Sequence, residues 1–329
     1  MSSLDALIFG PVPSRRLGRS LGINCIPPKC CTYACVYCQL GRTTKMTINR
    51  QHFYDSAELT EAVGRHINQS EAGGEAIDYL TLIADGEPTL EKNLFQIIRQ
   101  LKALGKKVAV ITNASLIWQD NVKEGLSEAD WVSLKTDAAE IETWRQINRP
   151  HHKLDFDQIQ KGMLAFAENY TGTLVTESML IRGINDQVKH VKKIADFIVQ
   201  LKPVTAYLGI PTRPPAEKGV KQPFESDLVR AFQIMQGQIN QVEYLVGYEG
   251  NAFSSTGDIV KDLLSITAVH PMRKEAIEAL IKKTDAAWSS VDQLIKSGLL
   301  IETEYMGKVY IMRKLSTPGN RGKMGVRME

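Results

Sequence analysis

The sequence lacks several features that would define a class of protein. None of its apolar stretches approaches the roughly 18 residues that a membrane span needs, and residues 1–5 have no apolar segment of the kind found in a secretory signal. We therefore expect a cytoplasmic protein without a membrane partner. An excess of one charge is also lacking, because 40 basic and 37 acidic residues leave a net charge of only +3. That excess is too small to indicate nucleic-acid binding by itself.

Cysteine is absent from most of the chain, since all five cysteines lie between Cys25 and Cys38. An odd number in so short a segment argues against a disulfide scaffold. Cys31, Cys35 and Cys38 have the spacing C-x3-C-x2-C. Soft thiolate ligands this close together on one loop are typical of an iron–sulfur cluster. A histidine ligand for zinc is lacking nearby, because His52 is the closest in sequence.

Three cysteine ligands would leave one iron of a 4Fe–4S cluster open to a substrate, much as a catalytic zinc keeps an open position. Two alternatives stay open at this point. One is a zinc knuckle, although zinc normally takes four ligands, often in two separated pairs. The other is an electron-transfer cluster with Cys25 or Cys30 as its fourth ligand.

Apolar and amphipathic segments alternate along the first 250 residues. Strands are expected at 21–26, 77–83, 107–112, 131–135, 174–181 and 204–210, with a weaker one at 242–246. Helices are expected at 56–67, 90–104, 156–169, 187–201 and 224–235. This alternation predicts an α/β fold with a parallel sheet, either doubly wound or a barrel. In both, the chemistry lies at the carboxyl ends of the strands.

The composition changes after the barrel-like part. Residues 247–257 are rich in turn formers, which indicates a linker. Three helical patterns follow at 258–266, 273–283 and 289–297, and then two alternating strands at 300–304 and 309–313. We therefore expect an α/β domain over residues 1–250 and a small C-terminal winged-helix domain over 258–314. The basic tail, 315–329, is expected to be flexible.

The cysteine segment, with Tyr37 directly before the last cysteine, resembles the signature of the radical S-adenosylmethionine (SAM) superfamily. The resemblance implies a partial (β/α)6 TIM-like barrel, a 4Fe–4S cluster on Cys31, Cys35 and Cys38, and SAM bound at the open iron. It also implies reductive cleavage of SAM to a 5′-deoxyadenosyl radical, with the difficult chemistry supplied by the cofactor. An external electron donor such as flavodoxin or ferredoxin is then required.

Polar residues at the predicted strand ends extend this resemblance. The segment 84–89 resembles the superfamily's Gly-Gly-Glu motif, with Asp85 in place of the first glycine. The expected cofactor contacts are Tyr37, Gly86, Glu87, Asn113, Ser133, Lys135 and Glu177. The alternative for each strand-end residue is a simple capping role. Lys135 is the most informative, because a buried lysine needs a partner and the cofactor carboxylate is a suitable one.

A narrower likeness points to one branch of the superfamily. The segments 112–114, 147–150 and 180–185 resemble the tRNA 4-demethylwyosine synthases and their uncharacterised relatives. Those synthases carry a second cluster on three upstream cysteines, whereas this chain offers only Cys25 and Cys30. The likeness therefore implies an uncharacterised relative, with RNA narrowly ahead of a peptide, a protein or a small metabolite as substrate.

Three arginines are candidates for binding an anionic group of the substrate. Arg15 and Arg16 lie in an arginine-rich segment before the first predicted strand, and Arg213 follows the sixth. The alternative for both segments is a solvated surface loop. A different kind of function also stays open, an iron–sulfur sensor that regulates transcription through the winged helix. The predicted recognition helix 289–297 has one acidic and one basic residue, which makes a poor phosphate-binding face.

Overall fold

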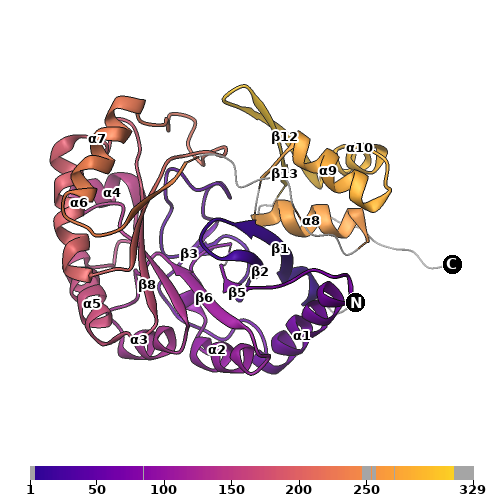
Figure 1. The fold of residues 1–329 in the computed structure, drawn as a ribbon, viewed down its shortest axis with the longest axis horizontal. Helices are drawn as coiled ribbons and strands as arrows, with labels where there is room; N and C mark the ends of the chain where they lie inside the picture. The colour runs from indigo at the N-terminus through magenta and orange to yellow at the C-terminus, as the bar shows by residue number, and fades with distance from the viewer. Residues whose placement is uncertain (1–3, 84, 247–252, 254–256, 270, 315–329) are drawn as a thin grey trace.

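The computed structural model in Figure 1 describes residues 4–83, 85–246, 253, 257–269 and 271–314. Its centre is a curled, open sheet of eight strands in the order β1-β2-β5-β6-β7-β8-β9-β10. These strands are β1 (Ile8–Ser14), β2 (Gly18–Ile23), β5 (Tyr79–Leu82), β6 (Lys107–Thr112), β7 (Trp131–Lys135), β8 (Thr173–Met179), β9 (Thr205–Gly209) and β10 (Val242–Leu245). From β2 to β10 all neighbours are parallel, and β1 pairs antiparallel with β2. The predicted α/β class is confirmed.

Seven helices of the described chain cover the outer face of this sheet (Figure 1). They are α1 (Ser56–Ala72), α2 (Leu94–Lys102), α3 (Asp120–Ser127), α4 (Ile141–Asn148), α5 (Phe156–Asn169), α6 (Val188–Leu201) and α7 (Glu225–Gln236). α5 begins where the sequence predicts, because the side chain of Asp155 accepts a hydrogen bond from Gln158 N at 2.9 Å. Together the sheet and helices place the carboxyl ends of seven parallel strands at one rim.

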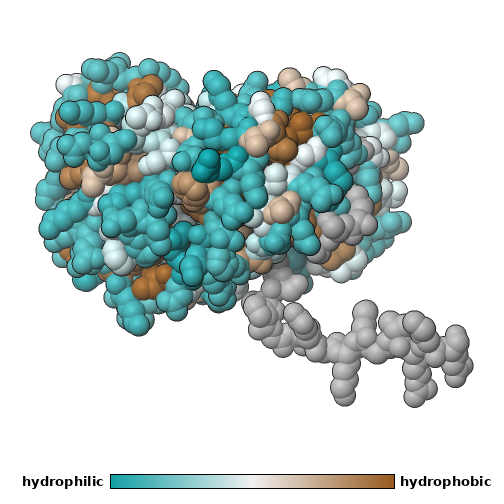
Figure 2. Space-filling view, turned by 90° about the horizontal axis from the view of Figure 1, so that it is seen from below, coloured by the Kyte–Doolittle hydropathy of each residue, from teal (hydrophilic) through white to brown (hydrophobic). Residues whose placement is uncertain are grey.

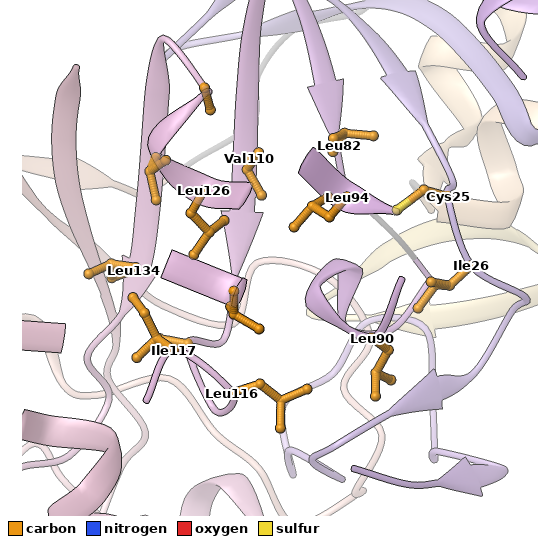
Figure 3. Packing of buried hydrophobic residues seen from close by; sticks show 14 of the residues in the cluster. Cys25, Ile26, Leu82, Leu90, Leu94, Val110, Leu116, Ile117, Leu126 and Leu134 are labelled. Atoms are coloured by element: carbon orange, nitrogen blue, oxygen red, sulfur yellow. The ribbon is translucent and has the colours of Figure 1, made fainter. Parts of the chain in front are cut away.

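The main core lies between the outer face of the sheet and these helices. Figure 3 shows Leu82, Val110 and Leu134 from β5, β6 and β7 beside Leu94 of α2 and Leu126 of α3. All five side chains are fully buried. Burying an aliphatic side chain of this kind stabilises the fold by roughly 1.5–3 kcal/mol.

The inner face of the sheet follows from the twofold alternation of strand side chains. Trp131 and Ala109 point inward and are buried together with Leu17, Val175 and Tyr207. This second, smaller core fills the inside of the curled sheet. Inward positions nearer the carboxyl ends of the strands carry polar residues, among them Lys135 and Glu177, and these line a cavity.

The N-terminal part differs from the prediction. The first strand was expected at 21–26, but β2 covers Gly18–Ile23 and a further strand, β1, precedes it. β1 contains Pro11 and Pro13, which lack the N–H that a central strand needs. Proline is tolerated in β1 because this strand lies at the edge of the sheet. Arg15 and Arg16 therefore lie in the turn of a β-hairpin and not in a free loop.

Residues 257–314 form a compact unit with its own core. It contains α8 (Ile259–Val269), β11 (Met272–Arg273), α9 (Lys274–Thr284), α10 (Ser289–Lys296), β12 (Leu300–Tyr305) and β13 (Lys308–Arg313). The three strands form a sheet in the order β11-β13-β12. Leu263, Ile277 and Leu300 lie in the core of this unit, and Val12 of β1 packs against it. The expected tail 315–329 and most of the expected linker 247–257 lie outside the described residues.

The surface agrees with the balanced composition. The face shown in Figure 2 is mostly hydrophilic, with apolar residues in small groups. No helix in the described ranges is long and apolar enough to cross a membrane.

Candidate active site

A cavity of about 360 Å³ opens at the carboxyl ends of the parallel strands. Cys31, Cys35 and Cys38 line one wall of it. Their loop begins at β3 (Cys30–Cys31), a two-residue strand that pairs in parallel with β4 (Lys45–Met46). The three thiols are partly exposed, in contrast to Cys25 and Cys30, which are buried. The loop thus presents three sulfur atoms to one space.

The C-terminal end of α4 holds this cysteine loop in place. Ala34 N donates to Asn148 O at 3.0 Å, and Val36 N donates to Ile147 O at 2.9 Å. Asn148 Nδ2 donates to Cys35 Sγ at 3.4 Å and to Asp137 Oδ2 at 2.8 Å. Backbone hydrogen bonds on both sides of Cys35, together with one from the side chain of Asn148, therefore fix its position.

The donor set fits a 4Fe–4S cluster. Burial raises the pKa of all three thiols, that of Cys35 to about 12, so metal binding must displace their protons. Each cysteine of such a cluster binds a different iron, whereas the ligands of a single ion must converge. In the described ranges no three His, Cys, Asp or Glu side chains converge on a position for one metal ion.

Cys25 and Cys30 lie away from the cavity wall. Cys25 is fully buried among aliphatic side chains, near Ile26 and Leu94 (Figure 3). Its Sγ lies 4.0 Å from Pro88 O, and Cys30 is 1% exposed. Neither thiol is among the residues that line the cavity. In this arrangement both act as small core side chains.

Gly86 and Glu87 stand where β5 approaches the cysteine loop. A Cβ atom on Gly86 would lie 1.7 Å from Cys30 O, so only glycine fits there. Glu87 is 1% exposed, and its carboxylate accepts bonds from Thr112 Oγ1 at 2.6 Å and Asn113 N at 2.7 Å. The carboxylate therefore ties the end of β5 to the end of β6.

A network of buried charges crosses the cavity floor. Glu177 pairs with Arg16 and, at 3.0 Å, with Lys135. Lys135 also lies 3.3 Å from Asp137 Oδ1, and Tyr37 OH donates to Asp137. Burial opposes the charge on Glu177, yet Lys135 and Arg16 together hold its pKa at about 2. We expected the cofactor carboxylate as the partner of Lys135, and the protein itself supplies two carboxylates instead.

The remaining predicted residues are placed as follows. Tyr37, Gly86, Glu87, Asn113, Lys135 and Glu177 all line the cavity, as do Arg15, Arg16 and Arg213. Ser133 does not, because it lies fully buried on β7 between Trp131 and Lys135. Arg213 donates to Gln39 Oε1 at 2.7 Å, so the loop after β9 is tied to the residue after Cys38.

Two charged residues of the cavity are not among the contacts predicted from the sequence. Lys29 and Asp85 line the cavity and are 7% and 2% exposed. In the described residues, Lys29 Nζ and Asp85 Oδ1 have no hydrogen-bond partner. Burial raises the pKa of Asp85 to about 7. For Asp85 the sequence does hold a signal, because the Gly-Gly-Glu motif that this segment resembles has glycine at that position.

The C-terminal unit also reaches the cavity mouth. Tyr305 OH donates to Pro211 O at 3.0 Å, and Tyr310 OH donates to Thr212 O at 2.9 Å. Both carbonyls belong to the loop that carries Arg213, and Pro211 and Thr212 themselves line the cavity. The hairpin of β12 and β13 thus supports one side of the opening.

Comparison with known proteins decides the family. The model of the Radical SAM superfamily matches residues 25–198, more than half of the chain. The chain belongs to the radical SAM superfamily. A UPF0026 protein of Methanocaldococcus jannaschii is 42% identical over 313 residues, covering 94% of this chain and 97% of that protein. A UPF0026 protein of Helicobacter pylori is 31% identical over 272 residues, 82% of this chain and 86% of its own.

Solved structures share the fold of this radical SAM protein. A structure of TYW1 with a lysine–pyruvate adduct bound aligns with a TM-score of 0.51 and 15% identity, over 67% of this chain and 74% of that one. A radical SAM methyltransferase from Sphaerobacter thermophilus gives 0.52 and 14%, over 71% and 68%. The predicted family and its cofactors, a 4Fe–4S cluster and SAM, are confirmed, and the protein is a radical SAM enzyme.

Proposed function

We propose that this enzyme reductively cleaves SAM to methionine and a 5′-deoxyadenosyl radical, which abstracts hydrogen from a substrate. Cys31, Cys35 and Cys38 hold the cluster that supplies this chemistry. The observation that carries the proposal is that three thiols and several charged side chains line one cavity at the strand ends. Superfamily members generally need an external reductant, and flavodoxin or ferredoxin is the proposed donor.

The cavity divides into regions with different roles. Tyr37, Gly86 and Asn113 border the cysteine wall and are the proposed neighbours of SAM. Glu177 and Lys135 pair with each other on the floor, so we assign them the positioning of nearby side chains and not a free charge for the cofactor. Ser133 is left out of the proposed contacts.

The substrate side is marked by arginine. Arg15, Arg16 and Arg213 come from two separate loops and line one cavity, and Arg16 is already paired with Glu177. Guanidinium groups suit carboxylate and phosphate, so we propose a substrate with an anionic group. RNA is the leading class, because the segments 112–114, 147–150 and 180–185 resemble those of the tRNA 4-demethylwyosine synthases. Part of the chain is also similar to part of an S-adenosylmethionine-dependent nucleotide dehydratase of Flammeovirga pacifica, with 27% identity over 125 residues, 36% of this chain and 43% of that protein.

We further propose two domains, a partial barrel over residues 1–250 and a winged helix over 258–314. The order of three helices and a three-stranded sheet in the C-terminal unit supports the winged helix. Its hairpin contacts the cavity loop, which favours a role in holding the substrate opening. A sensor that regulates transcription through this unit is the second candidate, and a peptide or protein substrate is the third.

One experiment separates the enzyme from the sensor. The protein is reconstituted with iron and sulfide without oxygen, reduced with dithionite and supplied with SAM. We expect 5′-deoxyadenosine and methionine in equal amounts, and we expect Cys35→Ala to abolish both. A reconstituted cluster that neither binds nor cleaves SAM would leave the sensor as the better explanation.

A further inference from the structure

The two segments that enclose the cysteine loop lack acidic residues. Residues 6–54 contain seven Lys or Arg and no Asp or Glu, although 37 of the 329 residues in the chain are acidic. Residues 143–154, which hold the loop from the other side, contain three Lys or Arg and again no acid. These two segments are therefore basic in a chain that is nearly neutral.

Part of this basic region faces solvent outside the cavity. The side chains of Arg42 and Arg149 are 77% and 50% exposed. Lys45 and Met46 of β4 are also exposed. None of these four residues lines the cavity. We call them the cluster-side face.

Backbone contacts bring this face directly behind the cluster ligands. β4 pairs with β3, which ends at Cys31, and Thr47 N donates to Cys31 O at 3.1 Å. Ala34 N donates to Arg149 O at 3.1 Å, one residue before Cys35. Strand pairing therefore joins the face to Cys31, and one backbone hydrogen bond joins it to the residue before Cys35.

An acidic residue, Glu217, lies beside the face. Glu217 pairs with Arg42 at 3.1 Å and with Arg149 at 2.8 Å, which places both arginines together. One carboxylate balances only one of these charges, and Lys45 adds another. An exposed methionine among basic residues suits a small, transient interface with an apolar centre and a charged rim.

We propose that the cluster-side face is the docking surface for a small acidic electron-carrier protein. The proposal rests on the proposed function and names the partner's binding site. The reduced carrier gives up one electron and is oxidised by one unit, while the cluster is reduced by one unit. Complementary charge steers such encounters and raises the association rate.

The position of the face favours this partner over RNA. The reacting group of an RNA substrate must enter the cavity, which this face does not line. A carrier protein needs only to come close to the cluster. The face offers that approach without closing the opening bordered by Arg213.

The test compares two reductants on the full-length reconstituted protein. Reduction of the cluster is followed by stopped-flow absorbance, first with reduced flavodoxin and then with photoreduced 5-deazaflavin, an uncharged small molecule. Arg42→Glu/Lys45→Glu reverses two charges of the face. Lys161→Glu, at an exposed lysine on α5, is the control for a charge reversal outside the face.

We expect the double variant to slow reduction by flavodoxin at least tenfold at low salt, and the wild-type rate to fall as salt rises. Lys161→Glu should match the wild type, and all three proteins should react equally with 5-deazaflavin. A change of less than twofold with flavodoxin, or an equal loss with both reductants, overturns the proposal. So does a variant that loses RNA binding while its flavodoxin rate stays unchanged. Formation of 5′-deoxyadenosine with 5-deazaflavin is scored separately, so failure of the proposed function is seen on its own.

Discussion

Asn148 donates a hydrogen bond from its side-chain amide to Cys35 Sγ across 3.4 Å. The same Nδ2 atom donates to Asp137 Oδ2 at 2.8 Å. Asp137 in turn lies beside Lys135, which pairs with Glu177. A proposed cluster ligand is therefore linked through one amide to the charge network of the cavity floor. Hydrogen bonds to cluster sulfurs are one of the protein's means of setting a reduction potential.

Removing this donor should make the reconstituted cluster harder to reduce. We expect Asn148→Ala to shift its midpoint potential to a more negative value by about 40 mV, which corresponds to ~1 kcal/mol for a one-electron couple. The amide favours the reduced, more negative cluster, and this preference is lost in the variant. A redox titration followed by electron paramagnetic resonance measures the shift.

Asn113 provides the matched comparison. Its Nδ2 lies 3.7 Å from Cys31 Sγ and bonds Thr32 Oγ1 at 2.8 Å, so its interaction with sulfur is weaker. Asn113→Ala should therefore shift the midpoint less than Asn148→Ala does. Equal midpoints in the wild type and the Asn148 variant, at full iron content, would contradict the assignment.

The two buried cysteines should be dispensable for the cluster. We expect Cys25→Ala/Cys30→Ala to bind as much iron and sulfide per chain as the wild type, because neither thiol lines the cavity. The Cys25 change alone should lower the free energy of unfolding by roughly 1 kcal/mol, since it leaves a small void in a packed core. Iron analysis and urea unfolding give the two quantities. Loss of one iron in four from the double variant would instead assign a fourth ligand.

Local sequence features predict many of the regular elements, although α3 and α4 are not among the expected helices. The bounds of β6, β7 and α5 agree with the prediction, because apolar periodicity and the Asp155 cap are encoded within each segment. The cysteine spacing likewise lies within eight residues. β1 was missed because Pro11 and Pro13 argue against a strand unless its position at the sheet edge is known.

Long-range pairing was beyond the reach of the sequence. Arg16 and Glu177 are 161 residues apart, and no local pattern indicates that they neutralise each other. The same holds for Tyr310, which bonds a carbonyl 98 residues away at the cavity mouth. Lys29 escaped notice because its burial depends on segments that fold around it. Residue type and strand-end position predicted which residues line the cavity, but not which of their charged side chains pair with each other.

Gly86 should be required for a correctly placed cysteine loop. In Gly86→Ala the new Cβ would have to move from 1.7 Å to at least 3.0 Å from Cys30 O, a backbone atom that cannot rotate away. We expect the variant to lose most of its iron on reconstitution. Gly219→Ala is the control, because nothing lies within 4 Å of its Cβ position. Normal iron content in Gly86→Ala would show that the cysteine loop can move to make room for the methyl group and still bind the cluster.

The tyrosines of the C-terminal hairpin should restrain the loop at the cavity mouth. Tyr305→Phe/Tyr310→Phe removes the two hydrogen bonds to this loop, each contributing about 1 kcal/mol, and also the bond that Arg273 Nε donates to Tyr310 OH within the C-terminal unit. Amide exchange in residues 212–222 should therefore accelerate at least tenfold. Hydrogen–deuterium exchange with mass spectrometry measures this. Tyr170→Phe is the control, because its OH donates to Ala129 O at the opposite end of the strands. Unchanged exchange at 212–222 in the double variant would mean that the barrel alone holds the loop.

The buried carboxylate of Glu177 should make stability depend on pH in acid. Its pKa of about 2 lies below the ordinary value of 4.5, so the folded state favours the charged form. The resulting stabilisation is complete above pH 4.5 and is lost as the pH falls towards 2. We expect Glu177→Gln to be roughly 3 kcal/mol less stable at pH 7, because Arg16 and Lys135 lose their partner. That difference should narrow between pH 4.5 and pH 3, measured by urea unfolding at each pH, whereas Glu168→Gln, an exposed change on α5, should behave like the wild type throughout. A difference in unfolding free energy that stays constant with pH would mean that the packing of the Glu177 side chain, and not its charge, stabilises the fold.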